Sequence, residues 1–211
     1  MQTPNIIFDL GGVILNIDIS KTKKALNELG IPQIDELFGY GHAASFFKDH
    51  EQGKISDDEF ISQLRDLVPR DIERDLVQNA WNALLLEFPV GRIRFLQELG
   101  KKHRIFLFSN TNGIHQDAFT KMYRSSFDNR NLDDLFEKAY YSHQMGLRKP
   151  DIESFRYIIN ESNLNPSETL FIDDAEINVQ GAVDAGLIGY HLKKGEDIRD
   201  IRFENLAKAM G

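Results

Sequence analysis

The sequence of 211 residues contains no cysteine. This absence excludes disulfides, thiolate nucleophiles and cysteine-ligated metals, and it leaves the redox compartment undetermined. Lysine and arginine are also few relative to aspartate and glutamate, 25 against 33, and the formal net charge is −8. Such a charge argues against a nucleic-acid-binding surface and does not favour association with membranes.

Long hydrophobic runs are missing as well. No apolar stretch approaches the roughly 20 residues that a membrane-spanning helix needs. The N-terminus, MQTPNIIFDL, has neither the basic region nor the long apolar region of a secretion signal. We therefore expect a cytoplasmic protein whose partner is a small molecule, without a nucleic-acid or membrane partner, either as a monomer or as a homodimer.

Short continuous apolar runs predict strands that are buried on both faces of a parallel sheet. Helical patterns separate most of these runs from residue 90 onward, and this alternation is typical of a doubly wound α/β sheet. The predicted strands lie at residues 6–8, 105–108, 138–142, 170–172 and 188–192.

A different pattern occupies residues 16–89, where no strand is predicted. Ser56 and Glu59 have the spacing of a capping box, which marks the start of a helix. Further on, residues 71–88 predict a long helix with an apolar stripe. The stripe consists of Ile72, Leu76, Ala80, Leu84 and Phe88. We therefore expect a helical insertion between the first strand and the rest of the sheet.

Polar residues follow the predicted strands at their carboxyl ends, where parallel α/β sheets bind ligands. The first strand is followed by Asp9, the second by Ser109 and Asn110, and the fourth by Asp173 and Asp174. The third strand is followed, after a loop, by Lys149. Three carboxylates at one edge repel one another, since two charges 4 Å apart cost on the order of 4 kcal/mol at an effective dielectric near 20. A divalent cation with oxygen ligands, such as Mg²⁺, removes that repulsion.

Together these residue types predict phosphoryl chemistry. A carboxylate can act as the nucleophile, a metal ion can spread the developing charge, and lysine, serine and asparagine can hold an anion with several oxygens.

Four segments in this order and at these spacings resemble the four motifs of the haloacid dehalogenase superfamily. The resemblance extends from residue 5 to about residue 190, and it is closest to hydrolases of the bacterial glucose-1-phosphate phosphatase type. The segments are FDLGGV, LFSNTN, RKPD and FIDDAEINVQGA.

The resemblance implies a role for each motif residue. Asp9 would form an aspartyl-phosphate, and Lys149 would neutralise charge on the nucleophile and the phosphate. Ser109 and Asn110 would hold phosphoryl oxygens. The Mg²⁺ ligands would be Asp9, the backbone carbonyl of Gly11, Asp173 and Asp174.

The family also implies a fold and an activity. We expect a Rossmann-like, three-layer α/β core with a parallel sheet, made of residues 1–15 and 90–211, and an inserted α-helical cap domain at residues 16–89. The expected activity is that of a Mg²⁺-dependent phosphatase acting on a small phosphorylated metabolite, in particular a sugar phosphate.

Gly11 departs from the family pattern, because most phosphatases of this superfamily carry at this position an aspartate that protonates the leaving group. A positioned general acid contributes typically 10²–10⁴-fold in rate. Three explanations remain open. Asp18, His115 or a residue of the segment 50–53 could supply the proton; the substrate could have a good leaving group, as a sugar 1-phosphate does, which we favour; or the protein could turn over poorly and bind phosphate.

Two alternative functions follow. A 2-haloacid dehalogenase also uses an aspartate nucleophile without the second aspartate, but it needs no metal, and the pair Asp173–Asp174 argues against it. A catalytically weak phosphate-binding protein would keep the pocket without the proton donor.

Overall fold

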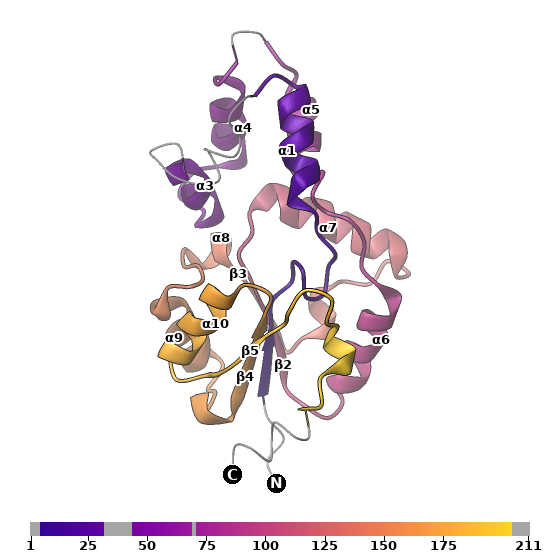
Figure 1. The fold of residues 1–211 in the computed structure, drawn as a ribbon, viewed down its shortest axis with the longest axis vertical. Coiled ribbons are helices and arrows are strands. Elements are labelled where there is room, and N and C mark those ends of the chain that lie inside the picture. Colours follow the sequence, from indigo (N-terminus) through magenta and orange to yellow (C-terminus); the bar gives the residue numbers. More distant parts are fainter. Residues whose placement is uncertain (1–4, 32–43, 69–70, 204–211) are drawn as a thin grey trace.

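A parallel sheet forms the centre of the computed structural model, which describes residues 5–31, 44–68 and 71–203. Within these residues the strand order is β3-β2-β1-β4-β5 (Figure 1). The five predicted strands are confirmed, and so is the predicted α/β fold class. The strands are β1 (Asn5–Phe8), β2 (Ile105–Ser109), β3 (Lys138–Tyr141), β4 (Thr169–Asp173) and β5 (Ile188–His191).

Helices cover both faces of the sheet. Side chains alternate between the faces along each strand, so both faces carry apolar side chains that must be buried. Ile6 and Phe8 of β1 pack with helices α6 (Val90–Leu99) and α7 (Gly113–Ser126). Ile7 points to the other face, which helices α9 (Ile152–Glu161) and α10 (Glu176–Asp184) cover. The core is therefore a three-layer sandwich. Shorter elements connect these parts: α8 (Ser142–Met145), η1 (Asp133–Leu135), η2 (Pro166–Glu168) and η3 (Ile198–Asp200).

The strand order reverses beside β1. From β1 the chain moves outward to β2 and β3, and it then returns to place β4 on the opposite side of β1. In open α/β sheets, such a reversal leaves a crevice at the carboxyl ends of the strands. The polar residues after β1, β2 and β4 all lie at this edge.

Among the described residues, four helices form a separate group above that edge, which we call the upper helical group. Its members contribute to a hydrophobic cluster of their own, which includes Leu26, Phe60, Leu64 and Trp81. Ile114, from the first turn of α7 in the core, also belongs to this cluster. The helices are α1 (Ile19–Glu28), α3 (Ala44–Glu51), α4 (Asp57–Arg65) and α5 (Arg74–Asn82).

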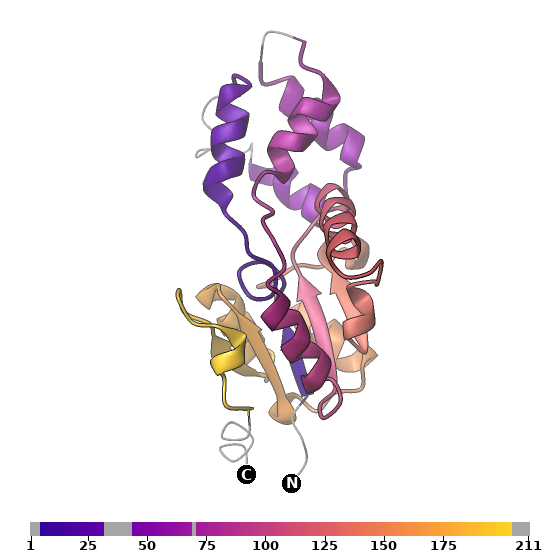
Figure 2. The same cartoon turned by 90° about the vertical axis from the view of Figure 1, so that its right-hand side faces the viewer.

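Two chain segments connect the upper helical group to the sheet, as the side view in Figure 2 shows. Residues 16–18 leave β1 and residues 84–87 return toward α6, and they pair in antiparallel fashion. The amide of Asn16 donates to the carbonyl of Glu87 at 3.0 Å, and the amide of Asp18 donates to the carbonyl of Leu84 at 2.9 Å.

This pairing explains one error in the predicted helices. The long helix expected at residues 71–88 is shorter, since α5 ends at Asn82 and the chain then becomes the returning connector. Leu76, expected on the buried stripe, is 49 % exposed, whereas Val77 and Trp81 are buried. The capping box of Ser56 and Glu59 at the start of α4 is confirmed. Among the described residues, no helix has the length and hydrophobicity needed to cross a membrane.

Candidate active site

The carboxyl ends of the central strands bring Asp9, Ser109 and Asp173 together. The amide of Asp9 donates to the carbonyl of Ile172 at 2.9 Å, which extends the pairing of β1 with β4 to the site itself. Asp9, Ser109 and Asp173 are all buried. Asp9 and Ser109 line a pocket of about 330 Å³ between the sheet and the upper helical group, and Asp173 lies next to it.

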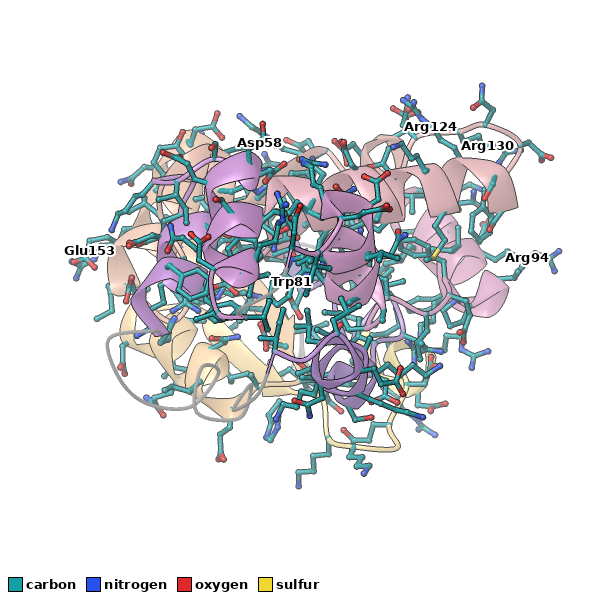
Figure 3. The ribbon with its side chains drawn as sticks, turned by 90° about the horizontal axis from the view of Figure 1, so that it is seen from above. Asp58, Trp81, Arg94, Arg124, Arg130 and Glu153 are labelled. Atoms are coloured by element: carbon teal, nitrogen blue, oxygen red, sulfur yellow. The ribbon has the colours of Figure 1, made fainter. Side chains whose placement is uncertain are left out.

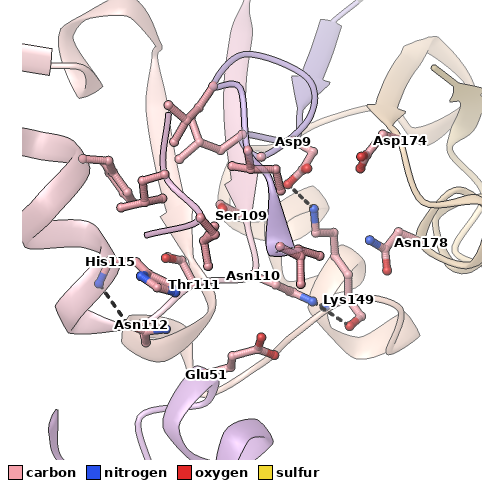
Figure 4. A pocket seen from close by; sticks show the side chains of 18 of the residues that line it. Asp9, Glu51, Ser109, Asn110, Thr111, Asn112, His115, Lys149, Asp174 and Asn178 are labelled. Atoms are coloured by element: carbon pink, nitrogen blue, oxygen red, sulfur yellow. Dashed lines mark hydrogen bonds and ion pairs between the residues drawn. The ribbon is translucent and has the colours of Figure 1, made fainter. Parts of the chain in front are cut away.

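Lys149 links the two buried carboxylates. Its Nζ donates to Asp9 Oδ1 at 2.5 Å, to Asp173 Oδ2 at 2.7 Å and to the carbonyl of Phe108 at 3.0 Å. The side chain is only 1 % exposed. An ammonium group has three N–H donors, so all three are satisfied here, as a buried charge requires. Figure 4 shows Lys149 pointing toward Asp9 from the opposite side of the pocket floor.

Burial and charge shift the pKa values of these groups. Burial raises the pKa of Asp9 to about 7; Lys149 opposes this shift and Asp173 adds to it. Burial alone would lower the pKa of Lys149, but the carboxylates of Asp9 and Asp173 outweigh burial and raise it. The ammonium of Lys149 therefore stays charged.

A cation would fit between the acidic side chains. Oxygens of Asp9, Asp173 and Asp174 lie within 4.8 Å of one another. Burial raises the pKa of Asp174, and the nearby charge of Asp173 raises it further. One lysine cannot neutralise three carboxylates, and a set made only of oxygen donors is the kind that Mg²⁺ prefers.

The two glycines after Asp9 have different structural roles. Gly12 has a φ of +77°, and a Cβ atom there would lie 2.2 Å from Asp174 Oδ2. Only glycine fits this position, because the left-handed backbone and the close carboxylate both exclude a side chain. Gly11 is less constrained: a Cβ atom would lie 3.1 Å from Cδ1 of Ile17.

Asp173 is held by several hydrogen bonds besides that from Lys149. The amide of Ala175 donates to Oδ1 at 2.8 Å, and Asn178 Nδ2 lies 3.1 Å from each carboxylate oxygen. Asn178, on the first turns of α10, thus orients this acid. Asp174 is exposed toward the pocket, so its oxygens are more accessible to a ligand.

Ser109 and Asn110 lie where the sequence predicts them, but they present different groups. Ser109 is buried at the end of β2 and lines the pocket. The side chain of Asn110 is bound to the backbone of Lys149: its Oδ1 accepts from the Lys149 amide at 2.9 Å, and its Nδ2 donates to the Lys149 carbonyl at 3.0 Å. This amide therefore positions the lysine loop, a role that the sequence pattern did not reveal.

Of the candidate proton donors, some line the pocket and others lie outside it. Asp18 caps helix α1, accepting from the amide of Ser20 at 3.0 Å, and it is not among the residues that line the pocket. His115 and Glu51 do line it. Burial lowers the pKa of His115 to about 3, with a further contribution from His50, so this imidazole is neutral near pH 7.

Glu51 reaches the pocket from helix α3. Its Oε2 accepts from Arg148 Nε at 3.0 Å and from Nη2 at 2.8 Å. Burial raises the pKa of Glu51, although Arg148 opposes that shift. Because Arg148 directly precedes Lys149, this ion pair connects the upper helical group to the loop that carries the lysine.

Trp81 is a pocket residue that sequence reasoning missed. It comes from α5 and lies near the middle of the molecule when the upper helical group is viewed from above (Figure 3). The chain has one tryptophan, but nothing in the local pattern separates a tryptophan that lines a pocket from one that fills a core. Leu84 and Leu85 in the returning connector add to the same wall.

Comparison with known proteins places this geometry in a family. The sequence pattern of haloacid dehalogenase-like hydrolases matches residues 4–186. A D-ribitol-5-phosphate phosphatase from Bacteroides thetaiotaomicron is 34 % identical over 195 residues, which cover 92 % of this chain and 94 % of the relative.

Solved structures agree over nearly the whole chain. A haloacid dehalogenase family enzyme from Bacteroides thetaiotaomicron, solved in complex with magnesium and inorganic phosphate, superposes with a TM-score of 0.85 at 32 % identity and covers 93 % of this chain and 98 % of its own. A protein from Porphyromonas gingivalis, described as a predicted hydrolase of the same kind, has a TM-score of 0.83 at 33 % identity, with 92 % of each chain covered.

Proposed function

The chain belongs to the haloacid dehalogenase-like hydrolase family, and from this premise we propose that it is a Mg²⁺-dependent phosphatase of small phosphorylated metabolites, in particular sugar phosphates. The observation that carries the proposal is Lys149 bound to both Asp9 and Asp173, beside the accessible acid Asp174. The similarity to a sugar-alcohol phosphate phosphatase supports the substrate class.

In the proposed reaction, a carboxylate oxygen of Asp9 attacks phosphorus in line with the ester oxygen of the leaving group. The new oxygen–phosphorus bond forms as the ester bond breaks, and the leaving alkoxide takes up a proton. Water then attacks the aspartyl-phosphate, which releases inorganic phosphate and restores Asp9. Lys149 stabilises negative charge on the phosphoryl group, and Ser109 donates to one of its oxygens.

Asp9, Asp173, Asp174 and the carbonyl of Gly11 are the groups that would hold Mg²⁺. The bound ion would supply electrostatic stabilisation of the charge that develops on the phosphoryl oxygens. A 2-haloacid dehalogenase would not require this acidic group, and a mere phosphate-binding protein would not require a nucleophile fixed by a buried lysine. The phosphatase is thus the function that accounts for both features.

We further propose that residues 16–89 act as a cap over the residues of the core. The ion pair between Glu51 and Arg148 and the contacts of Trp81 close one side of the pocket. A closed cap excludes water while the phosphoryl group is transferred. The cytoplasmic location stays a prediction.

The test is hydrolysis of p-nitrophenyl phosphate with Mg²⁺ by the wild-type protein and by Asp9→Asn. We expect the substitution to abolish turnover while the melting temperature stays close to that of the wild type. Asp18→Asn, at an acid outside the pocket lining, is the matched control and should keep its activity. Retained turnover in Asp9→Asn would contradict the mechanism, and metal-independent halide release from 2-chloropropionate would favour a dehalogenase.

A further inference from the structure

The pocket wall away from Asp9 contains a histidine that the proposed reaction does not use. His115 lies on the first turn of α7, where its backbone amide donates to the N-cap residue Asn112 at 3.0 Å. Figure 4 shows Ser109 and Thr111 between His115 and Asp9. A group bound at His115 would therefore belong to the leaving group of a phosphate ester, and not to its phosphoryl end.

Two residues of helix α5 fix the orientation of this imidazole. Its ring stacks on Trp81, with the ring centroids 4.9 Å apart and an interplanar angle of 13°. Its Nδ1 lies 2.8 Å from Asn82 Oδ1. A carbonyl oxygen only accepts hydrogen bonds, so Nδ1 carries the proton and Nε2 carries a lone pair. Among the described residues, Nε2 has no hydrogen-bond partner.

Few charged side chains line the pocket near His115. Burial keeps the imidazole neutral near pH 7, as described above. Apart from Asp9, Lys149 and Asp174 at the phosphoryl end, the charged residue among those lining the pocket is Glu51, and Arg148 binds its carboxylate. The described residues that line this part of the pocket offer no cation to a second phosphate or to a carboxylate on the leaving group.

Apolar side chains complete this part of the wall. They include Ile17, Leu84 and Phe119, the last of which lies one helical turn after His115 on the same face of α7. An apolar wall with a few polar groups, among them the imidazole of His115, is suited to a molecule with C–H faces and hydroxyl groups. Sugars and polyols have this combination.

We propose that His115 is a specificity-determining residue that accepts a hydrogen bond, through Nε2, from a hydroxyl of an uncharged, hydroxylated leaving group. Asn82 and Trp81 are positioning residues for its ring. This inference rests on the proposed phosphatase function and deepens it, because it assigns the recognition of the leaving group to named atoms.

The expected selectivity follows from the cost of leaving a buried polar atom unpaired. A substrate without the hydroxyl would displace water from Nε2 and offer no donor in exchange, so it should bind about tenfold more weakly. An ester whose leaving group carries a carboxylate should also be a poor substrate, since the described lining residues near His115 include no cation to pair with it.

The test compares three esters with a five-carbon chain: a pentitol 5-phosphate, pentyl phosphate and a pentonate 5-phosphate. With Mg²⁺, the wild-type kcat/KM should be highest for the pentitol ester, by about tenfold over each of the others. His115→Phe keeps a ring that can stack on Trp81 and removes both nitrogens. We expect it to raise KM for the pentitol ester about tenfold, with little change in kcat, and to leave pentyl phosphate unaffected.

His103→Phe is the matched control, because His103 lies outside the pocket lining, and it should retain the selectivity of the wild type. His115→Gln restores an acceptor oxygen and should recover part of the preference for the pentitol ester. Equal kcat/KM for the pentitol and pentyl esters in the wild type would overturn the inference, and so would an equal loss for both esters in His115→Phe.

Binding of the same esters to Asp9→Asn, measured by calorimetry with Mg²⁺, separates the two levels of the proposal. Tighter binding of the pentitol ester supports the role of His115 even if the wild type hydrolyses none of the esters, an outcome that would contradict the phosphatase function alone. Equal binding of the pentitol and pentyl esters would overturn the role of His115.

Discussion

At the scale of single residues, Gly11 removes an acidic side chain from the proposed active site. It stands where a carboxylic acid would otherwise reach the leaving group, and the described residues offer only incomplete substitutes for it. His115 is neutral, and Glu51 is paired with Arg148. If the proposed mechanism holds, the missing aspartate at position 11 should make ester hydrolysis depend strongly on the leaving group.

Restoring the acid should therefore accelerate the reaction with poor leaving groups. In Gly11→Asp we expect kcat for an alkyl phosphate to rise by about 10- to 100-fold, at the low end of the contribution of a general acid. Hydrolysis of p-nitrophenyl phosphate, whose leaving group needs little protonation, should change much less. Steady-state rates with both esters test this.

The new side chain needs some room, because its Cβ would lie 3.1 Å from Ile17 Cδ1. The double variant Gly11→Asp, Ile17→Val relieves that contact, and Ile17→Val alone is its control. Equal rate changes for the two esters would mean that the new carboxylate does not act on the leaving group.

His115 should also make the folded protein sensitive to acid. Its pKa falls from about 6.5 in the unfolded chain to about 3 in the folded protein, so between these values the unfolded state binds one more proton. The free energy of unfolding should therefore decrease as the pH falls from 6.5 to 3, by up to about 1.4 kcal/mol per pH unit.

Urea denaturation at a series of pH values measures this slope. His115→Phe should have a shallower slope than the wild type over that range, by up to one proton. Parallel curves for the wild type and His115→Phe would show that the imidazole takes up its proton in the folded state as it does in the unfolded state.

At the scale of elements, Arg92 joins three parts of the core. Arg92 lies on helix α6. Its Nε donates at 2.9 Å to Oδ2 of Asp197, which directly precedes η3. Its Nη1 donates at 2.9 Å to Oδ1 of Asn16, which belongs to the connector of residues 16–18. Burial alone would raise the pKa of Asp197, but hydrogen bonds from Arg199 and Arg92 outweigh it and lower the pKa to about 2. The carboxylate therefore stabilises the fold.

A group with a lowered pKa contributes its stabilisation above its unfolded pKa, near 3.8, and loses it as the pH falls toward 2. Asp197→Asn should reduce the free energy of unfolding at pH 7 by about 2 kcal/mol. The difference from the wild type should shrink between pH 4 and pH 2. Thermal unfolding across this range is the measurement, and Asp200→Asn in the same short helix is the control.

At the scale of the whole molecule, the acidic edge of the sheet is expected to couple metal binding to stability. A ligand that binds only the folded state stabilises it by RT ln(1 + [L]/Kd), or about 2.7 kcal/mol at a concentration of 100 Kd. Saturating Mg²⁺ should therefore raise the melting temperature of the wild type, and chelation should reverse the increase and abolish activity.

Asp174→Asn should remove most of this thermal shift, because it replaces an accessible carboxylate of the acidic group while leaving Lys149 bound to Asp9 and Asp173. Asp184→Asn, farther along the same chain segment at the end of α10, should keep the shift. A Mg²⁺-induced shift of the same size in Asp174→Asn would place the cation elsewhere on the protein.

Much of the site could be predicted from the sequence because its residues follow the strands directly. Asp9, Ser109 and Asp173 reach one edge of the sheet for the same reason: parallel strands end on the same side. Lys149 follows the third predicted strand only after a loop, so its assignment to the site depended mainly on the family motif.

The upper helical group could be predicted as helical, but its inner surface could not. Which residues of α5 are buried depends on the helices α1 and α4 that pack against it. The point at which α5 ends depends on the pairing of residues 84–87 with residues 16–18. The apolar period alone therefore placed Leu76 inside, and it did not identify Trp81 as part of the pocket.

The sequence by itself determined the order of strands and helices, the oxygen-rich edge and the absence of an acid at Gly11, because each of these depends on neighbours in the chain. Tertiary structure alone decided that Asn110 binds the Lys149 backbone, that Glu51 meets Arg148, and that Nδ1 of His115 meets Asn82. Those contacts join segments that lie 33 to 97 residues apart. Only packing of the folded chain brings such segments together.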